Sequence, residues 1–400
     1  MLIGIVGKPN VGKSTFFKAI TLADVEIANY PFATIKPNSG VAYVRIEDVA
    51  LKFGKAANPR EGYILGKYRF VPIQVIDVAG LVPGASEGKG MGNQFLDDLR
   101  QADALIHVID VSGSTNAQGE TVEPGSYDPR EDIKFLALEL DLWYLSILNK
   151  GWTRFARQIQ QEKSKIEVAL AKQLSGLKVN EEHIEKAIAK VGLNIDKPQE
   201  WTLDDLMALA TDLRKQTKPM IIAANKFDTV HGRENYEKIK EEFPKLPMIP
   251  VSAESELALR EATKASLIDY IPQEKSFNIL VGQKLTDRQR NALQFIKEKV
   301  MDASDFGTGV QEVLNTAIFS LLNMIAVHPG GVSKLEDKDG NTLPDCFLMP
   351  KGTTALEFAY KLHTDLGKTF IRAIDVYTKK TVGKEHVLKH LDIIEIVAGR

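Results

Sequence analysis

The stretch GKPNVGKS at residues 7–14 decides how this chain must fold. It fits the pattern G-x-x-x-x-G-K-[ST], directly follows the apolar run Leu2–Val6, and precedes a stretch that we expect to be helical. Glycines allow the backbone to curl so that successive N–H groups point at a phosphate, and the helix N-terminus adds its dipole to the same place. The sequence therefore predicts a phosphate-binding loop between a first buried strand and a first helix.

The side chains of this loop have distinct expected roles. Lys13 should reach the β- and γ-phosphates, which makes it a candidate catalytic residue, and the Ser14 hydroxyl should ligate Mg²⁺. A glycine-rich turn that binds nothing is the alternative interpretation. The residues of this region that we predict to contact a nucleotide are Asn10, Val11, Gly12, Lys13, Ser14 and Thr15.

A second candidate element is the tetrapeptide DVAG at residues 77–80, which follows the apolar run Pro72–Ile76. A carboxylate at the end of such a strand lies where ligands of α/β sheets bind. Asp77 could hold Mg²⁺ through water, and the N–H of Gly80 could face the γ-phosphate, although D-x-x-G is also an ordinary turn after a strand. The glycine-rich residues 84–92 that follow could reorganise when the γ-phosphate leaves, so they are a candidate switch.

A third element, NKFD at residues 225–228, follows the apolar run Met220–Ala224 and bears on the choice of base. In this geometry the Asp228 carboxylate accepts hydrogen bonds from guanine N1–H and from the amine at guanine C2. Adenine has a lone pair at N1 and no amine at C2, so the carboxylate would be left unpaired, and such a mismatch can favour guanine over adenine by about 10⁴. One backbone N–H after the run Met248–Val251 could donate to guanine O6. The predicted base-binding residues are Asn225, Lys226, Asp228, Ser252, Ala253 and Glu254.

The alternation of apolar runs and helical stretches predicts an α/β nucleotide-binding domain over residues 1–128 and 217–275. Residues 129–216 have a different character and are predicted to be a helical insertion, which would be either a packing appendage or a partner-binding arm. Apolar residues at helical spacing mark its first helix: Ile133, Leu136, Leu140, Trp143 and Ile147. We expect a second, more solvated helix over 157–172 and a last helix of the nucleotide-binding domain over 257–270. A helical connecting segment over 276–323 and a small α+β module over 324–400 complete the expected order.

The bulk composition excludes several classes of protein. The 400 residues are 44% apolar and 26% charged, with 51 basic and 53 acidic side chains, which is ordinary for a globular protein and gives no whole-chain argument for nucleic acid or membrane. The single cysteine, Cys346, rules out an internal disulfide and fits a reducing compartment. No apolar run approaches the roughly 20 residues of a transmembrane helix, and the N-terminus lacks a basic signal region. We therefore expect a cytoplasmic protein without membrane contact, and a monomer.

These motifs occur in the order that a guanine-nucleotide domain needs, and the whole chain resembles the Obg-related P-loop GTPases, specifically the YchF branch. The stretch NYPFATIKPN at residues 29–38 resembles the first switch of that branch, which implies Thr34 as a Mg²⁺ ligand that senses the γ-phosphate and acts in catalysis. Residues 77–93 are similar to its second switch. Residues 325–329 and 345–375 look like its C-terminal TGS segment, which implies a ubiquitin-like module.

The resemblance implies Mg·GTP hydrolysis to GDP and an association with ribosome or RNA, but two departures affect the mechanism. Best-known members of the branch have an altered base-reading motif and accept ATP, whereas NKFD retains the guanine-reading form. Leu81 occupies the position where many switch GTPases have the glutamine that orients the attacking water. Slow intrinsic turnover follows, with water oriented by a backbone group of the second switch, by Ser86, by a cation or by a partner.

Potassium is a candidate second cofactor. By resemblance to potassium-using GTPases, Asn10 could help to hold K⁺ against the phosphates, although it could equally be a plain turn residue. A modest basic excess marks the C-terminal module and is either a solvated face or an RNA contact. Its residues are Lys351, Lys361, Lys368, Arg372, Lys379, Lys380, Lys384 and Lys389. An ATPase of the same fold, and a nucleotide-dependent binding module with negligible turnover, are the alternatives to a GTPase switch.

Overall fold

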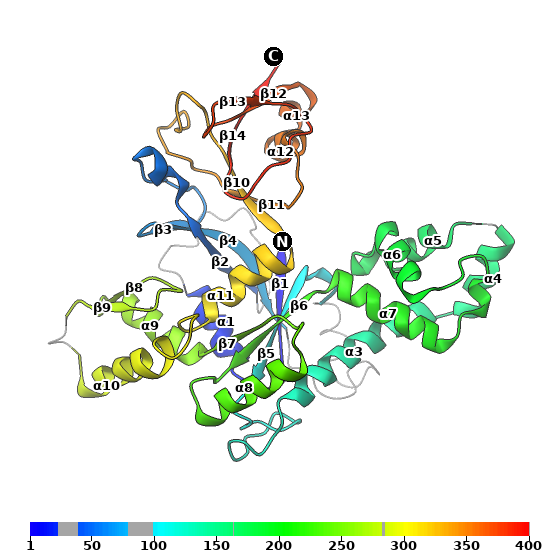
Figure 1. Ribbon diagram of the computed structural model, residues 1–400, viewed down its shortest axis with the longest axis horizontal. Coiled ribbons are helices and arrows are strands. Elements are labelled where there is room, and N and C mark those ends of the chain that lie inside the picture. The colour runs from blue at the N-terminus through cyan, green and yellow to red at the C-terminus, as the bar shows by residue number, and fades with distance from the viewer. Residues whose placement is uncertain (23–38, 79–98, 163, 282–284, 400) are drawn as a thin grey trace.

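A central sheet joins segments that lie far apart in the sequence (Figure 1). A computed structural model describes residues 1–22, 39–78, 99–162, 164–281 and 285–399. In spatial order the strands are β2 (Ser39–Glu47), β4 (Tyr68–Asp77), β1 (Leu2–Val6), β5 (Ala104–Asp110), β6 (Met220–Asn225) and β7 (Met248–Val251), with β3 (Tyr63–Leu65) paired to β4. Strands β4, β1, β5, β6 and β7 are parallel, whereas β2 and β3 run antiparallel to β4. The α/β class predicted from the sequence is confirmed.

Both faces of this sheet are covered, because side chains alternate along each strand. Ile3 and Ile5 pack on the face covered by α1 (Lys13–Thr21), α11 (Val310–Asn315) and the π-helical turn Thr316–Leu321. On the other face, Val6 packs against the helical insertion and Ile222 lies in a cluster with residues of α8 (Val230–Glu242). Burial on both faces explains why the parallel strands appear in the sequence as near-continuous apolar runs.

The insertion consists of α3 (Arg130–Asn149), α4 (Trp152–Glu162), α5 (Ile166–Gln173), α6 (Glu181–Val191) and α7 (Leu203–Thr217), with short 3₁₀ turns at Ser175–Leu177 and Pro198–Glu200. The single helix predicted over 157–172 is wrong, since α4 ends at Glu162 and α5 begins at Ile166. The core of the insertion is continuous with that of the main sheet. No helix within the described ranges has the length and apolar character needed to cross a membrane.

The segment after β7 also departs from expectation. Helix α9 spans Ala253–Lys264, and Ser266 then adopts φ 54°, which reverses the chain. The helix predicted to reach residue 270 is therefore wrong, because β8 (Ile268–Tyr270) pairs with β9 (Phe277–Ile279). Helix α10 (Asp287–Phe295) and the π-helical turn Ile296–Met301 follow. Since α11 packs on the central sheet, the segment that we expected only to connect two domains also contributes to the core.

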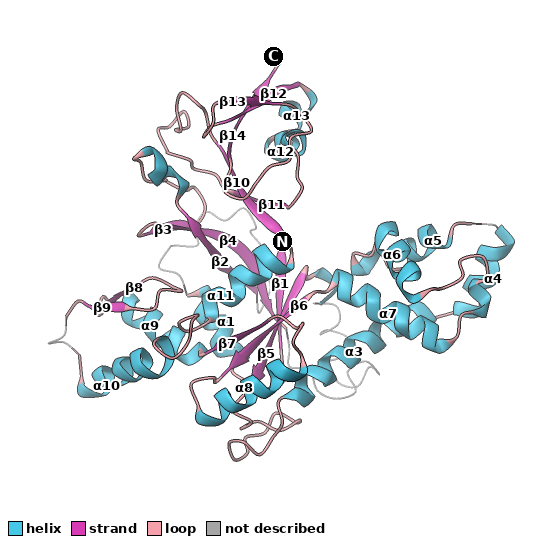
Figure 2. Cartoon of the chain, viewed as in Figure 1, coloured by secondary structure: helices cyan, strands magenta, loops and turns pink. Residues whose placement is uncertain are grey.

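The C-terminal module has a five-stranded mixed sheet with helices on one side (Figure 2). Its strands, in spatial order, are β11 (Phe347–Pro350), β10 (Met324–Pro329), β14 (Ile393–Ala398), β12 (Phe370–Asp375) and β13 (Lys380–Val382), and its helices are α12 (Ala355–Leu362) and α13 (Thr364–Lys368). The fully buried Arg69 of β4 donates to the carbonyl oxygens of Leu343, at 2.6 Å, and Pro344, at 2.8 Å. These bonds fasten the module to the main sheet.

Candidate nucleotide-binding site

The loop 7–14 turns sharply between β1 and α1, and two of its glycines are sterically required. A Cβ on Gly7 would lie 2.5 Å from the Val108 carbonyl oxygen, and one on Gly12 would lie 2.2 Å from Asn225 Nδ2. Gly12, the N-cap of α1, has φ 93°, and Asn10 has φ 63°, both in the left-handed region. The first turn of α1 contains no acidic residue and no side chain caps it, so its N–H groups stay open to an anion.

Lys13 and Asp77 lie together beside this loop. The Lys13 Nζ is 2.8 Å from Asp77 Oδ1, and the two side chains are only 12% and 18% exposed. The Ser14 side chain is exposed and Thr15 is half-buried, and neither hydroxyl has a hydrogen-bond partner among the described residues. An exposed hydroxyl at a helix start and a carboxylate at a neighbouring strand end are oxygen ligands of the kind that Mg²⁺ takes. Four predicted residues lie outside the described part of the chain: Thr34, Gly80, Leu81 and Ser86.

Asn225 joins three of the predicted motifs. Its Nδ2 donates to the Val11 carbonyl oxygen in the phosphate loop at 2.8 Å, and its Oδ1 accepts from the Ala253 N–H at 3.0 Å. The Ser252 N–H donates to the carbonyl oxygen of Thr308 at 2.9 Å. Two of the three backbone amides predicted for guanine O6 are therefore occupied, and the N–H of Glu254 is the one for which no described residue supplies an acceptor.

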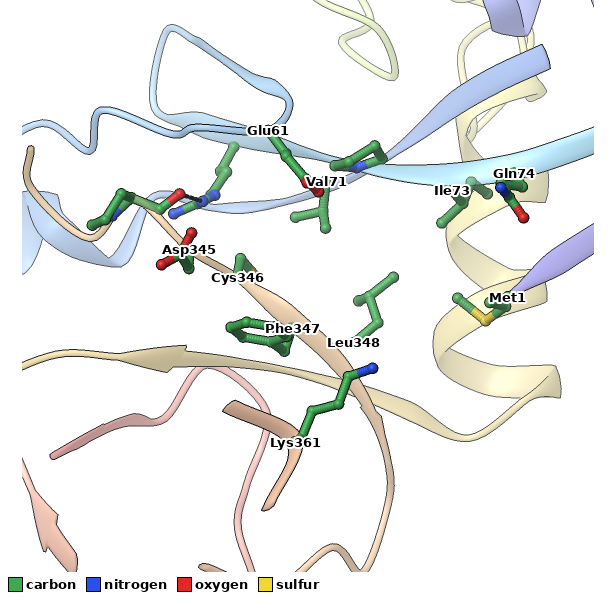
Figure 3. A pocket seen from close by; sticks show the side chains of 13 residues that line it. Met1, Glu61, Val71, Ile73, Gln74, Asp345, Cys346, Phe347, Leu348 and Lys361 are labelled. Carbon is green, nitrogen blue, oxygen red and sulfur yellow. Dashed lines mark hydrogen bonds between the residues drawn. The ribbon is translucent and has the colours of Figure 1, made fainter. Parts of the chain in front are cut away.

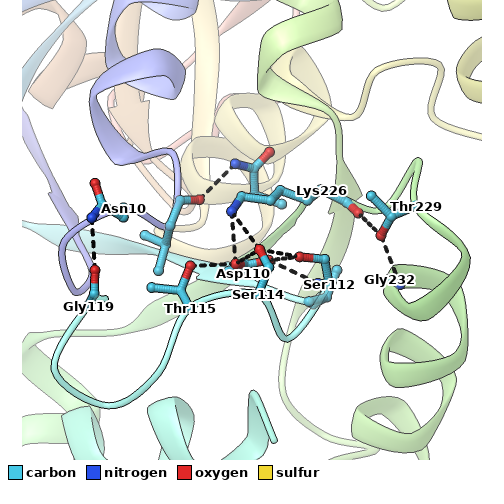
Figure 4. Close-up of polar contacts among 12 residues, drawn as sticks. Asn10, Asp110, Ser112, Ser114, Thr115, Gly119, Lys226, Thr229 and Gly232 are labelled. Carbon is cyan, nitrogen blue, oxygen red and sulfur yellow. Dashed lines mark hydrogen bonds and ion pairs between the residues drawn. The ribbon is translucent and has the colours of Figure 1, made fainter. Parts of the chain in front are cut away.

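Lys226 is held by a carboxylate that no motif pointed to (Figure 4). Asp110, at the end of β5, is fully buried and accepts from Lys226 Nζ at 2.8 Å, from the hydroxyl and N–H of Ser112, from the Ser114 hydroxyl at 2.8 Å and from the Thr115 hydroxyl at 2.6 Å. Burial alone would raise the pKa of Asp110, but Lys226 and the hydroxyl groups outweigh burial and hold that pKa below its ordinary value. Asp110 is thus a stable anion in the interior.

Asp228, the predicted base-reading carboxylate, is half-buried, and no described residue donates a hydrogen bond to it. The next residue, Thr229, is the N-cap of α8, where its hydroxyl accepts from the Gly232 N–H at 3.0 Å and donates to the Lys226 carbonyl oxygen at 2.9 Å. The backbone on both sides of Asp228 is therefore fixed while its carboxylate stays available to a ligand.

Lys8 fastens the phosphate loop to the insertion. Its ammonium is buried 2.8 Å from Asp132 Oδ2 in the first turn of α3, donates to the Thr115 carbonyl oxygen at 2.8 Å and lies 3.8 Å from the centre of the Tyr127 ring. Burial lowers the pKa of Lys8 and raises that of Asp132, partly offset by their attraction for each other. The sequence pattern gave no signal for this pair, since a lysine within the phosphate loop would be expected to face water.

A hollow of the molecule lies away from these loops. A cavity of about 310 Å³ is bounded by β4 and by the start of β11, with Arg69, Val71, Cys346, Phe347 and Lys361 among its lining residues (Figure 3). None of the residues predicted to bind nucleotide lines it. The candidate site is therefore the group of loops at the strand ends, which comprises residues 7–14, Asp77, residues 225–228 and residues 252–254. We call this group the loop cluster, and it is separate from the cavity.

Family models match three parts of the chain. Residues 2–140 match the 50S ribosome-binding GTPase model, residues 223–331 match the model described as Obg-like GTPase YGR210-like, G4 motif-containing domain, and residues 338–398 match the TGS domain. The matches include the phosphate loop, the base-reading motif and the C-terminal module, in the order found in the structure.

Relatives and solved structures agree with these matches. A GTP-binding protein of Methanocaldococcus jannaschii is 50% identical over 100% of this chain and 99% of its own length. The ribosome-binding ATPase YchF of Bacillus subtilis is 31% identical over 92% of this chain and 87% of its own. The crystal structure of a GTP binding protein from Pyrococcus horikoshii OT3 covers 100% of both chains with 41% identity and a TM-score of 0.79. The Schizosaccharomyces pombe YchF GTPase shares the fold, with a TM-score of 0.60 at 23% identity. The chain therefore belongs to the YchF branch of the Obg-related P-loop GTPases.

Proposed function

We propose that this protein binds Mg·GTP at the loop cluster and hydrolyses it slowly to GDP and phosphate, as a molecular switch. The observation that carries the proposal is the position of Asn225, which bonds to the phosphate loop through Val11 and to the start of α9 through Ala253. A nucleotide on the open N–H groups of α1 would then extend its base toward Asp228, whose carboxylate has no described donor. Guanine supplies the two donors that this carboxylate lacks.

Lys13 and Asp77 are proposed to exchange partners when the nucleotide binds. Lys13 Nζ lies 2.8 Å from Asp77 Oδ1, so each charge neutralises the other. A triphosphate would draw the Lys13 ammonium to the β- and γ-phosphates and release Asp77 to hold Mg²⁺ through water, with Ser14 and Thr34 as direct ligands. Bound Mg²⁺ would neutralise charge on the phosphates. Turnover is expected to be slow because Leu81 can neither donate to the attacking water nor accept from it.

Titration with labelled guanine and adenine nucleotides tests the proposal. We expect wild-type protein to prefer guanine, Lys13→Ala to lose GTP binding, and Asp228→Ala to lose most of its preference for guanine while still binding nucleotide. A stronger affinity for ATP in the wild type would favour the second candidate, an ATPase of the same fold, which the name of the Bacillus subtilis relative supports. Single-turnover phosphate release separates both from a binding module without turnover.

Association with the ribosome or with RNA in the cytoplasm is proposed for the switch as a whole. The names of the matched model and of the Bacillus subtilis relative support it, as do the exposed basic residues of the C-terminal module. Those eight lysine and arginine side chains are exposed, and among the described residues only Lys384 has an ion-pair partner, Glu385 at 4.0 Å. Ribosomes added to the phosphate-release assay should accelerate it if they supply the group that orients water.

Potassium is proposed as the cation that adds charge at the phosphates. Asn10 Nδ2 donates to the Gly119 carbonyl oxygen at 2.8 Å, which leaves its Oδ1 without a described partner. A side-chain oxygen at that place could accept a cation. Faster hydrolysis in KCl than in NaCl, abolished in Asn10→Ala, is the expected result, and equal rates in the two salts would remove K⁺ from the account.

A further inference from the structure

Asp110 lies where the loop after β5 meets the base-reading loop, and no sequence motif includes it. We propose that Asp110 is a positioning residue that sets the preference for guanine by holding the ammonium of Lys226 in place. The inference rests on the guanine-nucleotide site proposed above and names one determinant of its specificity.

The burial of Asp110 is the first part of the argument. Its side chain is 0% exposed, and a buried carboxylate is costly unless it is paired and hydrogen-bonded. Within the described residues its one ion-pair partner is Lys226, at 2.8 Å. Hydroxyl groups of Ser112, Ser114 and Thr115 satisfy the remaining acceptor positions. The carboxylate therefore presents a fixed negative charge to one lysine.

The position of the Lys226 ammonium depends on this charge. The Lys226 side chain is 33% exposed, so its ammonium could turn into water if the carboxylate were removed. Its other contact, the Ser114 hydroxyl at 3.2 Å, is itself oriented by Asp110. The Lys226 backbone has φ 64°, a left-handed conformation that costs free energy in any residue other than glycine and persists where neighbours enforce it.

Two side chains of the base-reading loop fasten it to distant parts of the fold. Asn225 fastens it to the phosphate loop and to α9, and Lys226 fastens it to the end of β5. Asp228 follows two residues later. Because hydrogen bonds weaken steeply with distance and angle, a small displacement of the Asp228 carboxylate would weaken both bonds to guanine. Contacts to the phosphates, which come from the other loop, would be preserved.

The test compares the affinities of labelled GDP and ADP for wild type and for Asp110→Asn, which keeps the side-chain shape and removes the charge. We expect the ratio of GDP to ADP affinity to fall at least tenfold, chiefly through weaker GDP binding, with the affinity for inorganic triphosphate and Mg²⁺ unchanged within twofold. Asp48→Asn is the matched control, because Asp48 is a buried carboxylate bonded to the N–H groups of Ala50 and Ala57 and lies in none of these loops. That variant should keep the wild-type ratio.

Lys226→Met removes the partly exposed partner of the same ion pair. It keeps the inference testable if Asp110→Asn does not fold. It should lower the ratio similarly, and the double variant should be no worse than either single variant, because each change removes the same interaction. Equal weakening of GDP and ADP, additive effects, or an unchanged ratio would overturn the role of Asp110 and leave the proposed function standing. A wild type that prefers ADP would overturn both.

Discussion

At the scale of single residues, Gly12 links the phosphate loop to the base-reading motif. A methyl group there would lie 2.2 Å from Asn225 Nδ2, and the residue has φ 93°. We predict that Gly12→Ala displaces Asn225 and strains the loop by about 1–3 kcal/mol, which lowers nucleotide affinity by about 5- to 150-fold. Fluorescence titration with labelled GDP measures this.

Gly54→Ala is the control for that change, because Gly54 also has positive φ, at 68°, but no atom lies within 4 Å of its added Cβ. It should lower stability slightly and leave nucleotide affinity as in the wild type. Equal affinities for the Gly12→Ala protein and the wild type would show that Asn225 does not depend on this close approach.

Two buried histidines should lower the free energy of unfolding in acid. Burial, assisted by the charge of Lys8 for His107 and of Arg69 for His328, lowers both pKa values from 6.5 to about 3. As the pH falls, the histidines bind protons in the unfolded chain before they do so in the folded protein. Their contribution to the free energy of unfolding is therefore fully present above pH 6.5 and is progressively lost toward pH 3. At pH 5 each histidine should cost about 2 kcal/mol of unfolding free energy relative to pH 7.

Urea unfolding of the wild type and of His328→Phe at pH 7 and pH 5 measures the histidine effect. Neither ring nitrogen of His328 has a hydrogen-bond partner among the described residues, so phenylalanine can replace the ring without breaking such a bond. Between pH 7 and pH 5, the free energy of unfolding should fall by about 2 kcal/mol less in the variant than in the wild type. Parallel losses in the two proteins would contradict the assignment.

Residues within contiguous motifs could be predicted, and residues that act across the fold could not. Lys13 and Asp77 were predicted from two separate motifs, and the structure brings their charges to 2.8 Å. Asp110 belongs to no motif and Lys8 occupies an unspecified position of the phosphate loop, and their partners lie 116 and 124 residues away in the sequence. A polar residue at a strand end is equally typical of a turn, so only the tertiary structure identifies these pairs.

At the scale of elements, the buried parallel strands were predicted well because burial on both faces leaves few other interpretations of an apolar run. The break between α4 and α5 was missed because the buried residues Ile159 and Ile166 lie seven residues apart, a spacing that one continuous helix would place on a single face. The early end of α9 was missed because a serine, and not a glycine, adopts the left-handed conformation at Ser266.

The insertion is fastened to the main domain by two lysines that cap the helical residues 99–101 just before β5. Lys218 Nζ donates to the carbonyl oxygens of Arg100 at 3.0 Å and Ala102 at 2.5 Å, and Lys178 Nζ donates to that of Gln101 at 2.7 Å. Burial lowers the pKa of Lys218 to about 8. These contacts support a packing role for the insertion, while its role as a partner-binding arm stays a prediction.

We predict that Lys218→Met lowers the free energy of unfolding by about 1.5–3 kcal/mol, because it leaves the buried carbonyl group of Ala102 without its charged donor. Lys178→Met is the matched comparison, since that residue is 46% exposed and should cost less than about 1 kcal/mol. Urea denaturation at neutral pH gives both values. Equal small losses would mean that the buried lysine contributes no more than an exposed one.

At the scale of the whole molecule, the candidate nucleotide site and the exposed basic residues of the C-terminal module belong to different parts of the chain. The candidate site lies at the strand ends of the central sheet, whereas the basic residues lie in the C-terminal module, which Arg69 fastens to β4. If the C-terminal module binds RNA, an effect of nucleotide on that binding would pass through the packing between the two parts.

If the exposed basic residues of the C-terminal module bind RNA, the affinity for RNA should depend on salt through them. If Lys379 and Lys380 neutralise phosphates, Lys379→Gln with Lys380→Gln should reduce the slope of log affinity for RNA against log salt by about 0.7–0.9 for each phosphate that is no longer neutralised. The control pair, Lys238→Gln with Lys245→Gln, removes the same exposed charge from the region of α8 and should leave the slope unchanged. Filter binding over a range of KCl concentrations is the measurement, and equal slopes in both double variants would exclude Lys379 and Lys380 from the RNA-binding surface.

The most direct test of the central claim is a crystal structure of the wild type with Mg²⁺ and a non-hydrolysable GTP analogue. The account predicts the triphosphate on the N–H groups of residues 7–14, Lys13 turned from Asp77 to the phosphates, and guanine bonded to Asp228 and to the Glu254 N–H. A nucleotide bound elsewhere, or a base that makes no contact with Asp228, would contradict it.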